Sequence, residues 1–178
     1  ESVLMNVFIS GGCKNGKSMH AQRLARDMAA EERKPLYYLA TMIPTDDEDR
    51  RRIRRHIAER DGWGFQTLEC GRNICSVLDG EADAEGVFLL DSVTALLSNE
   101  MFLPDGTFDF GAGKRVAEDL RRFARRTGNT VFVSDYIYSD GRLFDSYTEG
   151  YRRALALADR TLAEVCEQIG RASCRERV

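Results

Sequence analysis

An eight-residue segment near the start of the chain has the residue types and the spacing of a phosphate-binding loop. It matches the pattern G-x-x-x-x-G-K-[ST] through the residues Gly11, Gly12, Cys13, Lys14, Asn15, Gly16, Lys17 and Ser18. Glycines let backbone N–H groups turn inward around phosphate oxygens, and the N-terminus of a following helix adds partial positive charge. We therefore predict that Lys17 contacts the β- and γ-phosphates of a nucleoside triphosphate and that Ser18 offers its hydroxyl to Mg²⁺.

A second set of reactive side chains lies in the charged segment 46–60, which begins with acids and continues with bases. Arg52, His56 and Arg60 are four residues apart, so a helix places all three on one strip of its surface. Neighbouring guanidinium groups disfavour imidazolium and attract polyphosphate, which suits attack of a neutral His56 on phosphorus. Two alternatives stay open. One is an ordinary solvated helix face, and the other is a nucleic-acid patch, although no aromatic residues alternate with the arginines to stack bases.

Two carboxylates stand at the ends of short apolar runs. Asp91 ends the run 87–91, where it resembles the acid that completes Mg²⁺ coordination in phosphate-loop proteins. The alternative is a helix cap, because Asp91 and Ser92 precede a helical stretch. Glu69 ends the segment 65–69, where first principles require no acid.

Strands and helices that could position these residues alternate along the chain. The patterns predict strands over 7–10, 35–41, 65–69, 87–91 and 130–134, and helices over 19–30, 46–60, 72–78, 93–102, 114–126 and 145–168. This alternation predicts an α/β fold, a three-layer domain like that of phosphate-loop NTPases, with a mainly parallel sheet covered by helices on both faces. Ligands bind at the C-terminal ends of such strands. We expect no closing strand after Gln168.

The composition is that of a single globular domain, which we place at residues 5–167. The chain has 178 residues, of which 43% are hydrophobic and 31% charged, and its formal net charge is −3. An acidic balance argues against a generally basic nucleic-acid binder. No segment resembles a signal peptide and no apolar run is long enough to span a bilayer, so we expect a cytoplasmic protein without a membrane partner. Residues 168–178 are typical of a non-native tail.

Several segments follow one another in an order and spacing typical of a known family. Residues 11–21 are similar to the opening G-G-x-x-x-G-K-S-x-x-A, residues 39–41 to the second strand, residues 46–60 to D-x-E-M-x-x-R-I-x-x-H-x-x-x-R, and residues 65–69 to W-x-T-x-E. The chain thus resembles the bifunctional adenosylcobinamide kinase / adenosylcobinamide-phosphate guanylyltransferase family of cobalamin biosynthesis. It departs from the family at 134–138, where S-N-E-V-G is expected.

The resemblance implies two linked activities. In the first, ATP or GTP phosphorylates adenosylcobinamide, a corrinoid. In the second, His56 receives GMP from GTP and passes it to adenosylcobinamide phosphate. Lys17 and His56 would be the catalytic residues, and Ser18 and Asp91 would hold Mg²⁺. The nucleotide site would also contain Thr41, Arg60 and Glu69, and the family is expected to form a homotrimer.

Three other functions fit parts of the sequence. A monofunctional small-molecule kinase would use the phosphate loop alone and leave His56 on the surface. A GTP-dependent regulatory NTPase would share the loop, but the chain contains neither N-K-x-D nor T-K-x-D for guanine recognition. A nucleic-acid-stimulated NTPase would bind polymers through residues 50–60.

Overall fold

The strands of the protein pair in parallel and form a single sheet. The computed structural model describes residues 5–11, 17–135 and 146–172. For residues 17, 18, 171 and 172 it describes the backbone alone. Within the described residues the sheet has the strand order β3-β2-β4-β5-β1-β6. The strands are β1 (Val7–Gly11), β2 (Leu36–Ala40), β3 (Gln66–Glu69), β4 (Val87–Asp91), β5 (Thr130–Asp135) and β6 (Gln168–Ala172).

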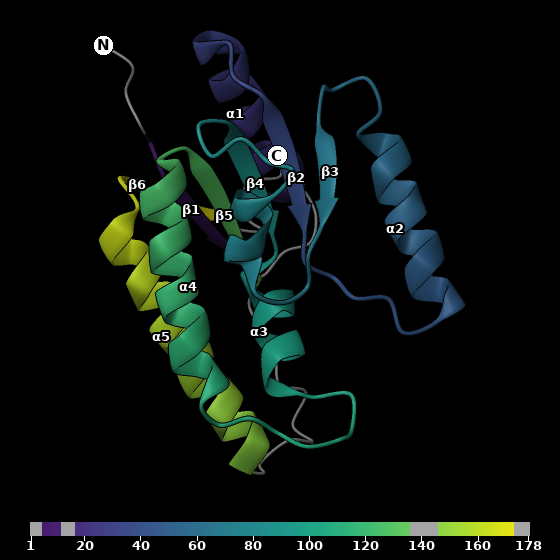
Figure 1. Ribbon diagram of the computed structural model, residues 1–178, viewed down its shortest axis with the longest axis vertical. Coiled ribbons are helices and arrows are strands. Elements are labelled where there is room, and N and C mark those ends of the chain that lie inside the picture. The colour runs from purple at the N-terminus through teal and green to yellow at the C-terminus, as the bar shows by residue number, and fades with distance from the viewer. Residues whose placement is uncertain (1–4, 12–16, 136–145, 173–178) are drawn as a thin grey trace.

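Helices cover both faces of this sheet, as Figure 1 shows. Helix α1 packs on one face, and α3, α4, α5 and the 3₁₀ helix η1 pack on the other, whereas α2 stands outside the edge strand β3. The helices are α1 (Lys17–Glu32), α2 (Asp47–Glu59), η1 (Ile74–Asp79), α3 (Val93–Met101), α4 (Ala112–Thr127) and α5 (Ser146–Val165). The predicted three-layer α/β fold is therefore confirmed.

The central strand β4 explains why the sheet is buried on both faces. Val87 and Leu89 face α1, while Phe88 and Leu90 face the opposite helical layer. Because successive side chains point to opposite faces, a strand covered on both sides is a continuous apolar run. The Phe88 ring meets the ring of Phe123 on α4 edge to face, with centroids 5.2 Å apart. These contacts hold β4 in the middle of the sheet, so that its last residue, Asp91, has a fixed position.

The C-terminal segment differs from the prediction. We expected a helix over 145–168 and no strand after Gln168, but α5 ends at Val165 and Gln168–Ala172 forms β6, which pairs in parallel with β1. The backbone N–H groups of Glu167 and Gln168 donate to the Asn6 carbonyl, at 3.0 and 3.3 Å, and so turn the chain onto β1. Residues 173–178 lie outside the described part. The non-native tail at 168–178 and the domain boundary at 167 stay predictions.

Two other features bear on the predictions. The short helix expected over 72–78 is the 3₁₀ helix η1. None of the helices in the described part of the chain combines the length and apolar character that a bilayer crossing requires.

A buried acid on α3 gives a test of the packing between α3 and α4. Glu100 is 7% exposed, its Oε2 has no hydrogen-bond partner, and its Oε1 lies 3.7 Å from Nη2 of Arg115. Burial raises the pKa of Glu100 above its ordinary value of 4.5. A raised folded-state pKa means that this group favours folding at low pH, and that the benefit is lost as the pH rises through the folded-state pKa.

We therefore expect Glu100→Gln to raise the free energy of unfolding at pH 7.5 by on the order of 1 kcal/mol, because the variant buries no charge. The gain should vanish at about pH 3, well below the ordinary pKa of 4.5, because the wild-type carboxyl is then protonated in both states. Urea denaturation at the two pH values measures the difference, with the exposed Glu118→Gln on α4 as a control. A gain that is equal at both pH values would contradict the assignment.

Candidate active site

The strand register brings several polar residues to one edge of the sheet. Glu69 pairs with Ala40, and Ala40 pairs with Asp91 on its other side. On the next two strands, Asp135 pairs with Gly11. The C-terminal ends of β3, β2, β4, β5 and β1 therefore lie side by side, which is where ligands bind in a parallel sheet.

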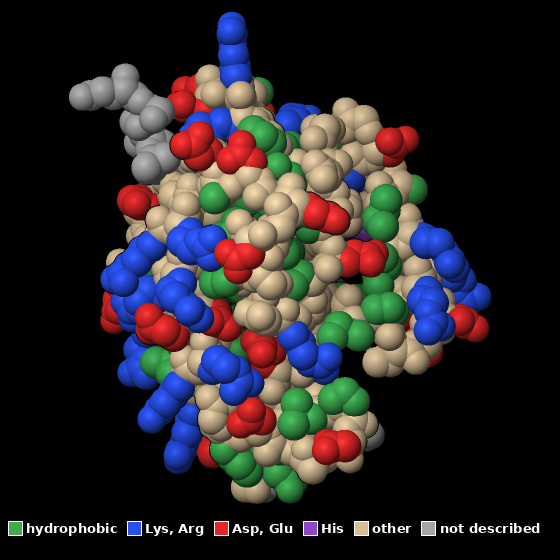
Figure 2. All heavy atoms as spheres, in the orientation of Figure 1, with side chains coloured by type: hydrophobic (Ala, Val, Ile, Leu, Met, Phe, Trp, Pro, Cys, Tyr) green, Lys and Arg blue, Asp and Glu red, His purple; other side chains and the backbone are tan. Residues whose placement is uncertain are grey.

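A cavity of about 440 Å³ lies over this edge, between the strand ends and α2. Figure 2 shows the hollow beside α2, with Lys and Arg side chains on the outward side of that helix. The wall is built by β2, β3, β4 and β5, by the start of α3 and by one side of α2. It contains five of the predicted functional residues, which are Arg52, His56, Arg60, Glu69 and Asp91.

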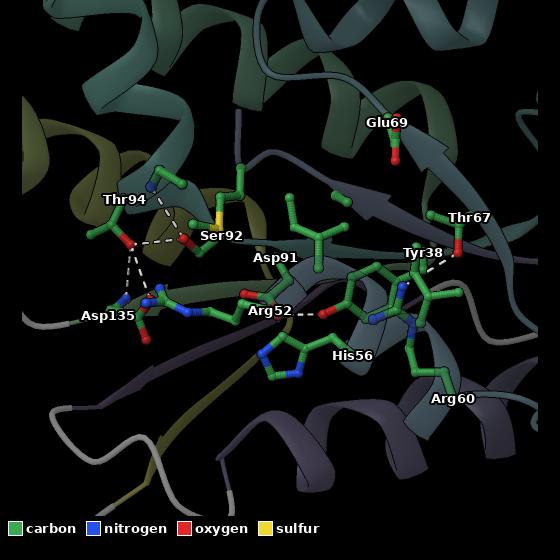
Figure 3. Close-up of a pocket in the computed structure, with 15 residues that line it drawn as sticks. Tyr38, Arg52, His56, Arg60, Thr67, Glu69, Asp91, Ser92, Thr94 and Asp135 are labelled. Carbon is green, nitrogen blue, oxygen red and sulfur yellow. Dashed lines mark hydrogen bonds between the residues drawn. The ribbon is translucent and has the colours of Figure 1, made fainter. Parts of the chain in front are cut away.

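Helix α2 presents its predicted strip to this cavity. Asp46 caps the helix, and its Oδ1 accepts a 2.7 Å hydrogen bond from the Asp49 N–H. Arg52 and His56 line the cavity together with Arg60, which follows the last helical residue (Figure 3). The prediction that a helix aligns these three side chains is confirmed. The imidazole Nδ1 of His56 lies 3.4 Å from Oε2 of Glu59, which leaves Nε2 on the other side of the ring.

Arg60 is the most enclosed cation of the site. It is 6% exposed, its guanidinium carbon lies 3.5 Å from the centre of the Tyr38 ring, and its Nη2 donates to Oγ1 of Thr67 at 3.3 Å. Its Nε has no hydrogen-bond partner. Burial lowers the pKa of Arg60, while Tyr38 and Asp91 oppose that change. An arginine stays protonated through such a shift, so Arg60 contributes a fixed positive charge.

Asp91 faces the cavity at the end of β4, where its Oδ2 accepts a short hydrogen bond from the Tyr38 hydroxyl (Figure 3). The helix-cap alternative for Asp91 is wrong, because the cap of α3 is Ser92, whose Oγ accepts from the Ala95 N–H at 3.1 Å. Asp91 thus offers a carboxylate on the strand two places from β1, which leads into the phosphate loop.

A second carboxylate lies between Asp91 and the phosphate loop. Asp135 ends β5, and its backbone N–H donates to Oγ1 of Thr94 at 3.3 Å. The same Thr94 hydroxyl lies 3.4 Å from Oδ2 of Asp135 and 3.0 Å from Oγ of Ser92. In Figure 3 the Arg52 side chain points toward Asp135. The cavity therefore places cations from α2 opposite carboxylates from the sheet.

The phosphate loop itself lies mostly outside the described residues. This holds for Gly12, Cys13, Lys14, Asn15 and Gly16, while Lys17 and Ser18 are described only as the first backbone positions of α1. Gly11 ends β1 beside Asp135, which lines the cavity. Neighbouring strands are about 5 Å apart, so the chain enters the loop one strand spacing from the cavity wall. The predicted strand before this segment and the predicted helix after it are confirmed.

Thr41, another predicted site residue, does not line the cavity. It is fully buried, and its Oγ1 donates to the Ser92 carbonyl and accepts from the Ser92 N–H, both at 2.7 Å. The side chain therefore ties the end of β2 to the start of α3 and is not turned toward a ligand. Its place in the nucleotide site stays a prediction, and in the structure its side chain supports Ser92, which lines the cavity.

Several polar residues of the cavity were not predicted as site residues, among them Tyr38, Thr67, Thr94 and Asp135. Asp135 follows directly after the predicted strand 130–134, so the rule that strand ends bind ligands could have found it. No sequence pattern singled out Tyr38, because the adjacent Tyr37 has the same side chain. The two rings lie on opposite faces of the sheet, and of the two only Tyr38 lines the cavity. Among the described residues, no group of three or more His, Cys, Asp or Glu is arranged to hold a metal ion.

The parallel sheet, together with the sequence G-x-x-x-x-G-K-[ST] at residues 11–18, is that of the phosphate-loop class of nucleotide-binding proteins. The model of the cobinamide kinase / cobinamide phosphate guanyltransferase family matches residues 7–174. The chain belongs to this family.

Two curated relatives carry the name bifunctional adenosylcobalamin biosynthesis protein. CobU of Salmonella typhimurium is 28% identical over 120 residues, which cover 65% of this chain and 63% of the relative. CobP of Pseudomonas aeruginosa is 37% identical over 101 residues, covering 57% and 56%. The matched region thus spans less than two thirds of these relatives. A KaiC-like protein from Pyrococcus horikoshii has a TM-score of 0.50 at 14% identity, covering 98% of this chain and 73% of its own, and supports the fold alone.

The hydrogen bonds between Thr41 and Ser92 can be tested for their contribution to the stability of the cavity wall. Thr41→Val keeps the shape of the side chain but leaves the Ser92 N–H and carbonyl without their partner. We expect a loss of about 2 kcal/mol in the free energy of unfolding, since buried backbone groups would lose their hydrogen bonds. Chemical denaturation measures it. Thr107→Val, in an exposed turn, should change stability by less than about 0.5 kcal/mol, and equal effects of the two substitutions would refute the claim.

Proposed function

We propose that this protein carries both family activities. It would phosphorylate adenosylcobinamide with ATP or GTP, and then transfer GMP from GTP to adenosylcobinamide phosphate through a GMP–histidine intermediate on His56. The observation that carries the proposal is the placement of His56 in one cavity with Arg52, Arg60 and Asp91, at the sheet edge where β1 leads into the phosphate loop. The proposal includes a cytoplasmic homotrimer that has neither nucleic acid nor membrane as a partner.

The kinase step asks for positioning and charge neutralisation more than for covalent chemistry. Lys17 and the backbone N–H groups of the loop would hold the β- and γ-phosphates while the acceptor hydroxyl attacks the γ-phosphorus. Carboxylate and hydroxyl oxygens are suitable ligands for Mg²⁺, so Asp91 and Ser18 fit a role in holding it. When bound, Mg²⁺ supplies positive charge against the phosphate oxygens.

The transferase step divides one displacement into two. A ring nitrogen of His56 would attack the α-phosphorus of GTP, forming an N–P bond as the P–O bond to pyrophosphate breaks. A phosphate oxygen of adenosylcobinamide phosphate would then attack the same phosphorus and release the imidazole. Arg52 and Arg60 are the cations of the cavity that would stabilise charge on the transferred phosphate.

The space around α2 suits a bulky acceptor. Two further hollows of about 500 and 460 Å³ flank the helix, and both share Ile57 and Glu69 with the cavity of His56. A nucleotide bound beside His56 would therefore lie next to open space on more than one side of α2. This continuity supports a large corrinoid as the group that receives GMP.

The guanylyl-transfer step is tested with GTP labelled at the α-phosphorus. We expect wild-type protein to acquire acid-labile label, because a phosphorus–nitrogen bond is formed, and we expect His56→Ala to acquire none. The chain has one other histidine, the exposed His20 on α1, so His20→Ala is a matched control that should label normally. Label that persists in His56→Ala would refute the nucleophile. Transfer of γ-phosphoryl groups without α-label on the wild type would indicate a monofunctional kinase.

The kinase step is tested with Lys17→Ala. We expect the rate of γ-phosphoryl transfer to adenosylcobinamide to fall by about 100-fold, since the variant loses a cation that stabilises the transferred phosphate. Transfer of γ-label measures the rate, and Lys114→Ala on the exposed side of α4 should leave it unchanged. An unchanged rate in Lys17→Ala would remove the phosphate loop from the mechanism.

A further inference from the structure

Helix α2 carries His56, yet it is poorly anchored by its own side chains. No residue of Asp47–Glu59 is buried. The first buried side chain after the helix is Arg60, whose backbone N–H still donates to the His56 carbonyl at 3.2 Å. The position of His56 relative to the sheet therefore depends on what holds Arg60.

Arg60 is held from the sheet side by Tyr38 of β2. The guanidinium lies over the Tyr38 ring, 3.5 Å from its centre, in a geometry that is attractive for a cation and an aromatic face. The ring is itself fixed edge to face against Phe65, with centroids 5.6 Å apart at an interplanar angle of 84°. Thr67 of β3 accepts a hydrogen bond from the same guanidinium. This stack joins the C-terminal end of α2 to two strands.

The same tyrosine also contacts the carboxylate of the site. Its hydroxyl donates to Oδ2 of Asp91 at the end of the neighbouring strand β4. One side chain thus contacts Arg60 through its ring and Asp91 through its hydroxyl, as Figure 3 shows. Neither contact requires a bound ligand.

We propose that Tyr38 is a positioning residue, which orients Asp91 through its hydroxyl and, through the ring beneath Arg60, sets the place of His56 opposite that carboxylate. The catalytic part of this inference rests on the proposed function, whereas the anchoring of α2 does not. Tyr38 acts on the reaction only through its contacts with Arg60 and Asp91. These contacts fix the geometry of the site before substrate binds, so less ordering is needed during the reaction.

Two substitutions separate the two roles of the side chain. Tyr38→Phe keeps the ring and removes the hydroxyl, so α2 should stay in place while Asp91 loses the hydrogen bond from Tyr38. We expect the rate of α-label incorporation from GTP to fall by about 10- to 100-fold, the usual effect of losing a group that orients a ligand residue. Tyr38→Leu removes the ring as well, and hydrogen exchange of the α2 amides should become about fivefold faster than in the wild type.

The adjacent Tyr37 supplies a matched control. Its ring is in the opposite hydrophobic layer, and its hydroxyl accepts a 3.0 Å hydrogen bond from the Asp83 N–H. Tyr37→Phe should leave both the label incorporation and the α2 exchange unchanged. Arg60→Met serves as a second anchor variant if Tyr38→Leu does not fold, and the same acceleration of α2 exchange is expected.

A double-mutant cycle distinguishes positioning from general destabilisation. If Tyr38 acts through Asp91, then Tyr38→Phe in an Asp91→Asn background should cost little further activity. The proposal would be overturned if the losses of activity caused by Tyr38→Phe and Asp91→Asn multiplied in the double variant. It would also be overturned if hydrogen exchange of the α2 amides were unchanged in both Tyr38→Leu and Arg60→Met. Exchange is measured without nucleotide on the whole chain. If the wild type takes up no α-label, the proposed function fails, and the exchange result still decides whether Tyr38 anchors α2.

Discussion

The parallel register of the strands is the constraint on which the site depends. Because Glu69, Ala40 and Asp91 pair across three strands, and Asp135 pairs with Gly11, the chain brings five strand ends to one edge of the sheet. The apolar layers on both faces hold that register, since a slip of one residue would move every side chain of the strand into the opposite layer, where its packing partners differ. The site is therefore a consequence of how the core packs, and its polar groups need no cluster of neighbours in the sequence.

Charged side chains determine how α2 packs against this edge of the sheet. The helix brings cations to a rim of carboxylates, but its outer residues remain exposed, and surface ion pairs contribute little to stability. Arg60 differs because it is buried, and the cost of removing its charge from water is offset by the Tyr38 ring and by Thr67. A helix that is fixed mainly at one end keeps open space on both of its sides, which suits a reaction with one small donor and one large acceptor.

Local patterns were sufficient for the features that local physics determines. The order of strands and helices followed from apolar periodicity, and the alignment of Arg52, His56 and Arg60 followed from a spacing of four residues. Strand β6 was missed because residues 168–178 were assigned to a non-native tail, and because its pairing with β1 is accompanied by hydrogen bonds to the distant Asn6. Tyr38 was not singled out for a related reason, since the sequence does not show which side chains of a strand face the cavity.

The central claim is that His56 and the phosphate loop bind one nucleotide at the shared edge of the sheet. A crystal structure of the protein with a GTP analogue in which a methylene group joins the α- and β-phosphorus atoms tests this most directly, because the analogue cannot release pyrophosphate. The account predicts a ring nitrogen of His56 within about 3.5 Å of the α-phosphorus, in line for attack. An α-phosphate bound away from every copy of His56 in the assembly would contradict it.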